Sequence, residues 1–120
     1  MVTKKAKIDS FDIAYRQSGE QGPPVVFIHG NSFSSEIFHK QLESNLADSY
    51  RLIAFDLPGH GRSSWSDNPE NDYTLENFAR ILAAFSKELD IENAVFAGWC
   101  LGGHILLEAA VHRGIVTGKL

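Results

Sequence analysis

Short apolar runs alternate along this chain with segments whose apolar residues recur at helical spacing. The runs at 25–28, 51–55 and 94–98 are each followed by a glycine-containing turn sequence, and a further run at 114–118 resembles the start of another strand. Continuous apolar strands separated by helical segments are typical of parallel sheets covered on both faces. We therefore predict an α/β fold, with a mostly parallel sheet and helices on both faces.

The periodicity also predicts helices and an opening hairpin. Apolar residues recur every four positions from Phe38 onward and predict a helix over 35–46. Thr74 is a favourable N-cap for a second helix, which continues to about Leu89. The other elements expected are a helix over 101–113 and two short hairpin strands at 6–8 and 11–16.

Three loops follow the three buried strands, and their sequences are rich in glycine and polar residues. They read HGNS at 29–32, DLPGHGRSS at 56–64 and GWCLGG at 98–103. Ligands of open α/β sheets bind beyond the carboxyl ends of the strands. We therefore expect these loops to converge at one edge of the sheet and to form the functional site there.

The third loop contains the chain's only cysteine, Cys100, in the pattern glycine, any residue, nucleophile, any residue, glycine. Such a strand–turn–helix segment raises a reactive side chain above a tight turn, and small residues such as Gly98 and Gly102 let neighbouring segments approach closely. The following helix N-terminus favours a thiolate. Cys100 is thus a candidate nucleophile, and the alternative is a small residue buried in the core.

Attack on an acyl carbonyl by this thiol would create an oxyanion that needs hydrogen-bond donors. The backbone amide of Leu101 is one candidate donor, and the loop after the first buried strand must provide the other. We assign that second donor to the backbone of Asn31, with Ser32 as the substitute. His29 and Gly30 are expected to support this loop.

Two aromatic residues beside these motifs, Phe33 and Trp99, are candidates for lining an acyl-chain site, or are core aromatics. The sequence offers no convincing acid–base pair for Cys100. We expect His29 to brace its own loop and His104 to have a packing role. The other histidines lie in a turn, on an exposed helix face and near a helix end, at His60, His39 and His112.

The segments VVFIHGNS, AFDLPGHGRS and GWCLGGHI, in this order and spacing, resemble the N-terminal half of an α/β-hydrolase. In detail, HGNSFSSEIFHKQLES together with GWCLGGHI is similar to the α/β-hydrolase-fold lactonases that open N-acyl homoserine lactones. The resemblance implies an acyl-enzyme intermediate, no metal and no cofactor. It also implies that Asp56 shapes its turn. Dehalogenase or epoxide hydrolase chemistry is not expected, because those relatives need a carboxylate at the position of Cys100.

The chain departs from this family in two ways. The resembling lactonases have serine where this chain has Cys100, although cysteine is an accepted nucleophile in some α/β-hydrolases. Family members are also more than twice as long, with the acid and the histidine after the nucleophile. We therefore expect residues 1–120 to be the N-terminal part of a single α/β-hydrolase domain, truncated after the sixth strand, with the acid and the histidine in a segment beyond it.

Composition and charge narrow the expected partners. The 120 residues carry a formal net charge of −4 and a single cysteine, so nucleic acid, a membrane and an internal disulfide are not expected. The start of the chain lacks the apolar stretch of a signal peptide, which favours a cytoplasmic location.

We expect an ester or lactone hydrolase acting on a small molecule. The alternatives are a non-catalytic binding protein and an inactive fragment. An unpaired apolar strand at the sheet edge also predicts a homodimer or a domain-swapped assembly.

Overall fold

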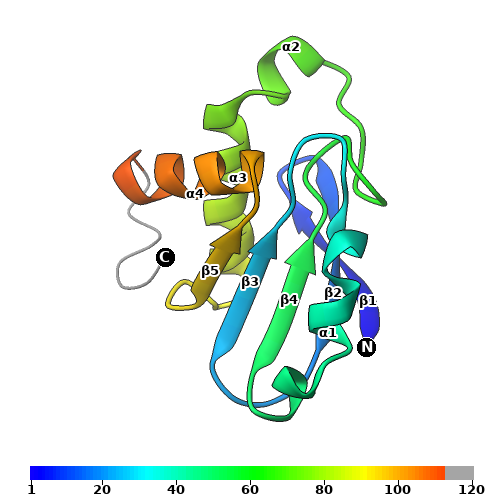
Figure 1. Ribbon diagram of the computed structural model, residues 1–120. Helices are drawn as coiled ribbons and strands as arrows, with labels where there is room; N and C mark the ends of the chain where they lie inside the picture. The colour runs from blue at the N-terminus through cyan, green and yellow to red at the C-terminus, as the bar shows by residue number, and fades with distance from the viewer. Residues whose placement is uncertain (113–120) are drawn as a thin grey trace.

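A computed structural model describes residues 1–112, so the strand expected at 114–118 lies outside the described residues. The described part is a five-stranded sheet in the order β1-β2-β4-β3-β5, with helices against both faces (Figure 1). The strands are β1 (Val2–Ile8), β2 (Phe11–Ser18), β3 (Pro24–Ile28), β4 (Arg51–Phe55) and β5 (Val95–Gly98). The predicted α/β class is confirmed.

The sheet is mixed rather than uniformly parallel. The hairpin β1–β2 was expected, but its strands are longer than expected, and β2 joins β4 in antiparallel orientation. Strands β4, β3 and β5 are mutually parallel, and Ile28 at the end of β3 lies opposite both Phe55 and Gly98. The three loops that follow these strands therefore leave the same edge at the same level, as predicted.

One face of the sheet is covered by α3 (Leu75–Glu88) and α4 (Leu101–His112). Thr74 caps α3 as expected, because its hydroxyl oxygen accepts a hydrogen bond from the Asn77 amide at 3.1 Å. The largest side chains buried beneath this layer are aromatic. Phe55 of β4 stacks on Phe85 of α3 with ring centroids 4.8 Å apart, so α3 lies firmly against the sheet.

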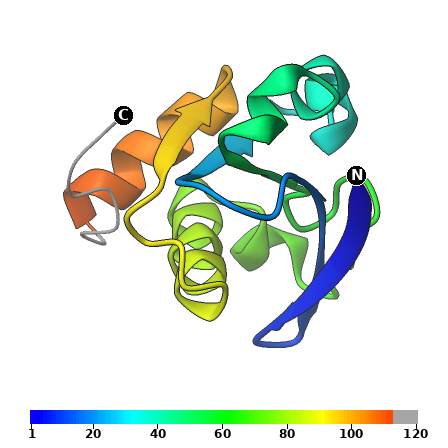
Figure 2. The ribbon, with the colours of Figure 1, turned by 90° about the horizontal axis from the view of Figure 1, so that it is seen from below.

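The opposite face is covered by three short turns of helix rather than by the single helix expected over 35–46. They are η1 (Ser35–Phe38), α1 (His39–Leu42) and η2 (Asn45–Asp48), and Figure 2 shows α1 across the sheet from α3. Ser44 interrupts the helix because its hydroxyl donates to the Gln41 carbonyl and accepts from the Leu46 amide. Leu46 is consequently 44% exposed, whereas Leu42 is buried.

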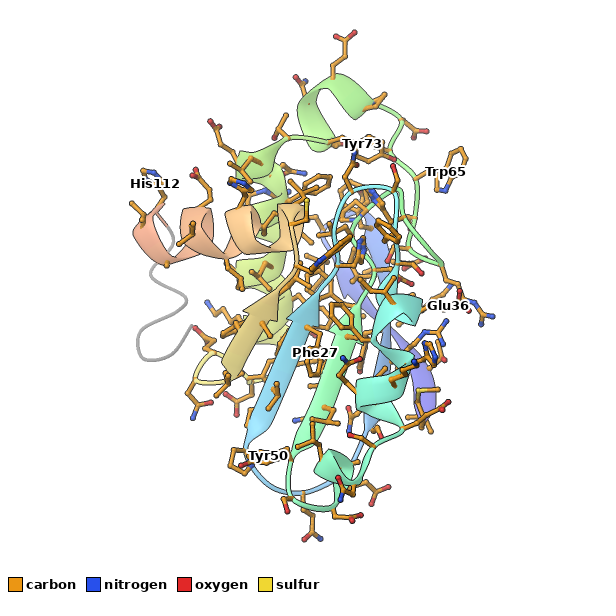
Figure 3. All side chains as sticks on the ribbon, viewed as in Figure 1. Phe27, Glu36, Tyr50, Trp65, Tyr73 and His112 are labelled. Carbon is orange, nitrogen blue, oxygen red and sulfur yellow. The ribbon has the colours of Figure 1, made fainter. Side chains whose placement is uncertain are left out.

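A small core lies beneath these turns. The ring of Phe27, which points from β3 toward α1 (Figure 3), contacts that of Phe38 with centroids 5.0 Å apart. A short helix that the apolar pattern did not indicate, α2 (Pro69–Asp72), precedes α3. Among residues 1–112, none of the helices has the length and apolar composition needed to cross a membrane.

Candidate active site

Cys100 lies in the turn between β5 and α4, and we call residues 98–102 the Cys100 turn. Its backbone has φ +55°, in the left-handed region that side-chain-bearing residues rarely adopt. Such conformations cost about 1–3 kcal/mol and cluster at functional sites. The side chain is exposed, so the alternative of a buried core cysteine is wrong.

Close packing explains the two glycines of the Cys100 turn. A Cβ placed on Gly98 would lie 2.5 Å from the Gly102 carbonyl carbon, and one on Gly102 would lie 2.2 Å from the Ile28 carbonyl oxygen. The start of α4 therefore rests directly on the ends of β3 and β5. The Trp99 amide also donates to the Ile28 carbonyl at 3.0 Å. Leu101 is the first residue of α4, and the first amides of a helix have no acceptor within it.

The loop that follows β3 lies against the Cys100 turn, and we call residues 29–35 the oxyanion-candidate loop. A Cβ on Gly30 would lie 2.7 Å from the Trp99 ring and 3.3 Å from the Cβ of Cys100. The Phe33 amide donates to the Gly30 carbonyl at 3.3 Å, which closes a tight turn through Asn31 and Ser32. Both of these middle residues are exposed, and Ser32 has φ +65°.

His29 is buried at the start of this loop, and both of its ring nitrogens have partners. Nδ1 donates to the Gly30 carbonyl at 2.7 Å, and Nε2 accepts from the Leu57 amide at 3.1 Å. Because a carbonyl can only accept and an amide can only donate, the proton lies on Nδ1. Burial lowers the pKa of His29 below its ordinary value. This imidazole is therefore neutral, and its nitrogens are occupied.

Asp56, directly after β4, binds two loops through its buried carboxylate. Its Oδ1 accepts from the Ser35 amide at 2.7 Å, and its Oδ2 accepts from the Arg62 amide at 3.1 Å. The Ser35 hydroxyl in turn accepts from Nε of Arg16 at 3.0 Å. Arg16 and Ser35 were not predicted from the sequence to be parts of the site. In the sequence they are ordinary polar residues, and only the structure shows that Ser35 is buried and Arg16 partly buried.

An apolar pocket opens beside the two loops. The rings of Phe33 and Trp99 meet edge to face with centroids 4.9 Å apart, and each side chain remains about half exposed. They are therefore not core aromatics. With three residues of η1 and α1 they line a pocket of about 480 Å³; these are Ile37, Phe38 and Gln41. The structure thus brings together Cys100, the oxyanion-candidate loop and both predicted lining residues.

The remaining histidines do not join this group. His39, His104 and His112 are exposed, and His60 packs in its turn against the rings of His29 and Phe78. Within residues 1–112 no histidine or carboxylate forms a hydrogen bond with Cys100. The same residues contain no group of three or more side chains placed to hold a metal ion.

The sequence and the fold together define the class of protein. A family model described as "alpha/beta hydrolase fold" matches residues 23–113, and the chain belongs to that family. Curated relatives include a non-heme chloroperoxidase of Streptomyces lividans, 38% identical over 79% of this chain and 34% of its own length. A haloalkane dehalogenase of Mesorhizobium japonicum is 33% identical over 92% of this chain and 35% of its own length.

Among solved structures, the N-acyl homoserine lactonase AidH complexed with N-butanoyl homoserine is similar to this chain. It superposes with a TM-score of 0.91 and 37% identity over 99% of this chain and 43% of its own. A mutant of the same lactonase, complexed with N-hexanoyl homoserine lactone, also gives a TM-score of 0.91 at 37% identity. The chain therefore spans about a third of the curated relatives and less than half of the lactonase.

Proposed function

We propose that this protein is a hydrolase of carboxylic esters or lactones that forms an acyl-enzyme on Cys100. The observation that carries this proposal is the left-handed conformation of Cys100, at a turn against which Gly30 is packed. A strained cysteine at this place serves no packing need, because its side chain is exposed. N-acyl homoserine lactones are the favoured substrates, because a lactonase is 37% identical over nearly the whole chain.

The chemistry begins with the thiolate of Cys100. Its sulfur bonds to the carbonyl carbon of the substrate, and the carbonyl oxygen becomes an oxyanion. The amides of Leu101 and Asn31 donate to that oxyanion, with Ser32 as the substitute for Asn31. The carbon–oxygen bond of the ester then breaks, the alkoxide takes up a proton, and a thioester remains on Cys100. Water cleaves the thioester to release the acid and regenerate the thiol.

The apolar pocket gives this reaction its substrate class. Phe33, Trp99 and Phe38 give the pocket an aromatic surface, and none of the residues that line it is charged. An aliphatic acyl chain is the part of an acyl homoserine lactone that such a surface binds. The ester or lactone carbonyl would then lie over the Cys100 turn.

Intact-protein mass spectrometry tests the proposal. The chain is exposed briefly to N-hexanoyl homoserine lactone and, separately, to p-nitrophenyl butyrate, with Cys100→Ala as the matched control. Acyl mass on Cys100, or consumption of substrate that requires Cys100, is the expected result. If the chain binds the lactone without acylation or turnover, it is a binding protein on a hydrolase scaffold. With neither binding nor acylation, the proposal fails.

A further inference from the structure

Two consecutive residues after β4 hold the two ends of the oxyanion-candidate loop. The Leu57 amide donates to Nε2 of His29, where the loop begins. The carboxylate of Asp56 accepts from the amide of Ser35, where the loop ends and η1 begins. The 29–35 segment is therefore tied at both ends to the same short piece of chain.

The Asp56 contact is the stronger of the two ties. It is a charge-assisted hydrogen bond of 2.7 Å, and the Asp56 residue is only 4% exposed. A buried carboxylate needs hydrogen-bond donors, and here backbone amides provide them. The 59–63 turn wraps the same carboxylate closely, since a Cβ on Gly61 would lie 2.4 Å from Oδ2. Asp56 thus couples the oxyanion-candidate loop to the loop that follows β4.

Ser35 is fixed from a second direction as well. The residue is fully buried, and its hydroxyl accepts from Nε of Arg16 on β2. Between Ser35 and His29 the chain includes the positive φ of Ser32 and the exposed Asn31. A tight turn of this kind holds its conformation only if its ends are held.

We propose that Asp56 is a positioning residue for the oxyanion donor: its hydrogen bond to Ser35 holds the loop so that the Asn31 amide faces the carbonyl attacked by Cys100. This inference rests on the proposed function. Asp56 itself touches neither the substrate nor the thiol. Its loss should slow acylation, which needs the oxyanion donor, and leave untouched a reaction of Cys100 that needs no such donor.

Two reactions of the same thiol separate these effects. Acylation is measured as the burst of p-nitrophenolate released from p-nitrophenyl butyrate, and alkylation as the rate of modification by iodoacetamide. In Asp56→Asn the amide side chain can accept from only one of the two backbone amides. We expect the burst rate to fall about 10- to 100-fold, toward the loss seen when an oxyanion donor is removed. The alkylation rate should stay within about twofold, since thiol exposure and chemistry are unaltered.

A matched control and a second variant complete the experiment. Asp48→Asn changes an exposed aspartate of η2 and should leave both rates unchanged. Ser35→Pro deletes the same hydrogen bond from the donor side, which keeps the test available if Asp56→Asn does not fold. Its burst rate should fall further than that of Ser35→Ala, which retains the amide.

The outcomes distinguish this inference from the function on which it rests. If the unaltered chain shows a burst and the variants match it, the positioning role is wrong while the hydrolase proposal stands. Equal losses of acylation and alkylation would also overturn it, because they would indicate a general disturbance of the Cys100 turn. If the unaltered chain is alkylated but never acylated, the proposed function fails, and the positioning role fails with it.

Discussion

Phe33 and Trp99 meet edge to face, with ring centroids 4.9 Å apart, although 66 positions separate them in the sequence. One ring belongs to the oxyanion-candidate loop and the other to the Cys100 turn. The pair therefore joins the two loops and forms a wall of the apolar pocket at the same time.

Replacing Phe33 with alanine should weaken the preference for long acyl chains. Phe33→Ala removes apolar surface that would bury the acyl chain, and burial of one methylene group contributes about 0.8 kcal/mol, which corresponds to about a 4-fold effect. We expect the ratio of burst rates for p-nitrophenyl hexanoate over acetate to fall by that factor in Phe33→Ala. Trp65→Ala, which removes a ring that points away from the molecule (Figure 3), should leave the ratio unchanged. An unaltered ratio in Phe33→Ala would show that this pocket does not hold the acyl chain.

A methyl group on Gly30 should disturb the contact between the two loops. In Gly30→Ala the new Cβ meets the Trp99 ring at 2.7 Å, so the ring or the loop must shift. We expect a loss of about 1–3 kcal/mol in the free energy of unfolding, typical of overpacking, together with a slower acylation burst. Gly103→Ala is the matched control, because its Cβ would lie 3.6 Å from the nearest atom. Chemical denaturation of both variants measures the difference, and equal stability would contradict the packing described.

Acid should destabilise the fold through His29. Its pKa in the folded chain lies below the ordinary 6.5 of the unfolded chain, because burial penalises the charged ring. Above pH 6.5 the ring is neutral in both states, and its full contribution to stability is present. As the pH falls below 6.5 the unfolded chain takes up a proton first, so the free energy of unfolding decreases until the folded pKa is reached.

Denaturant midpoints between pH 8 and pH 5 measure this decrease, and the exposed-histidine variant His39→Gln should show the same decrease as the unaltered chain. A midpoint that does not change with pH in the unaltered chain would contradict a lowered pKa of His29 in the folded state.

Among residues 1–112, β5 is the outermost strand on its side of the sheet, and this edge should promote association of the chain with itself. The opposite edge of the sheet, β1, carries Lys4, Lys5 and Lys7, whereas β5 consists of Val95, Phe96, Ala97 and Gly98. Lysines on an edge strand discourage further strand pairing, and an uncharged apolar edge permits it. We propose that two copies pair through β5.

Sedimentation velocity should show a dimer that dissociates in Ala97→Lys and persists in Val2→Lys, which adds a charge to the β1 edge. A monomer at all concentrations would contradict this association.

Much of this architecture was predictable because the apolar runs and the turn sequences indicate the same strand ends. The strand–turn–helix around Cys100 follows from Gly98 and Gly102, whose close contacts leave few other conformations. The prediction of a single helix over 35–46 was wrong. The Ser44 hydroxyl forms a hydrogen bond with the Gln41 carbonyl and so competes with the backbone hydrogen bonds of a continuous helix, an effect that apolar spacing does not reveal. The mixed strand order depends on contacts between distant segments.

The site shows the same division between local and distant information. Local patterns identified Cys100, Asn31 and the two aromatics as candidates. The structure places Phe33 and Trp99 in one pocket and brings Gly30, the neighbour of Asn31, against the Cys100 turn. The tie between Asp56 and Ser35 joins residues 21 positions apart, so its two partners can be matched only after the fold is known.

The glycines around the Cys100 turn also limit how this protein can vary. Neither Gly98 nor Gly102 has room for even a methyl group, and the atoms that exclude it are backbone atoms that no side-chain rearrangement can move. The side chain at position 100, by contrast, is exposed. A substitution at position 100 should therefore change the side chain that this turn presents, whereas a substitution at either glycine should displace the backbone that presents it.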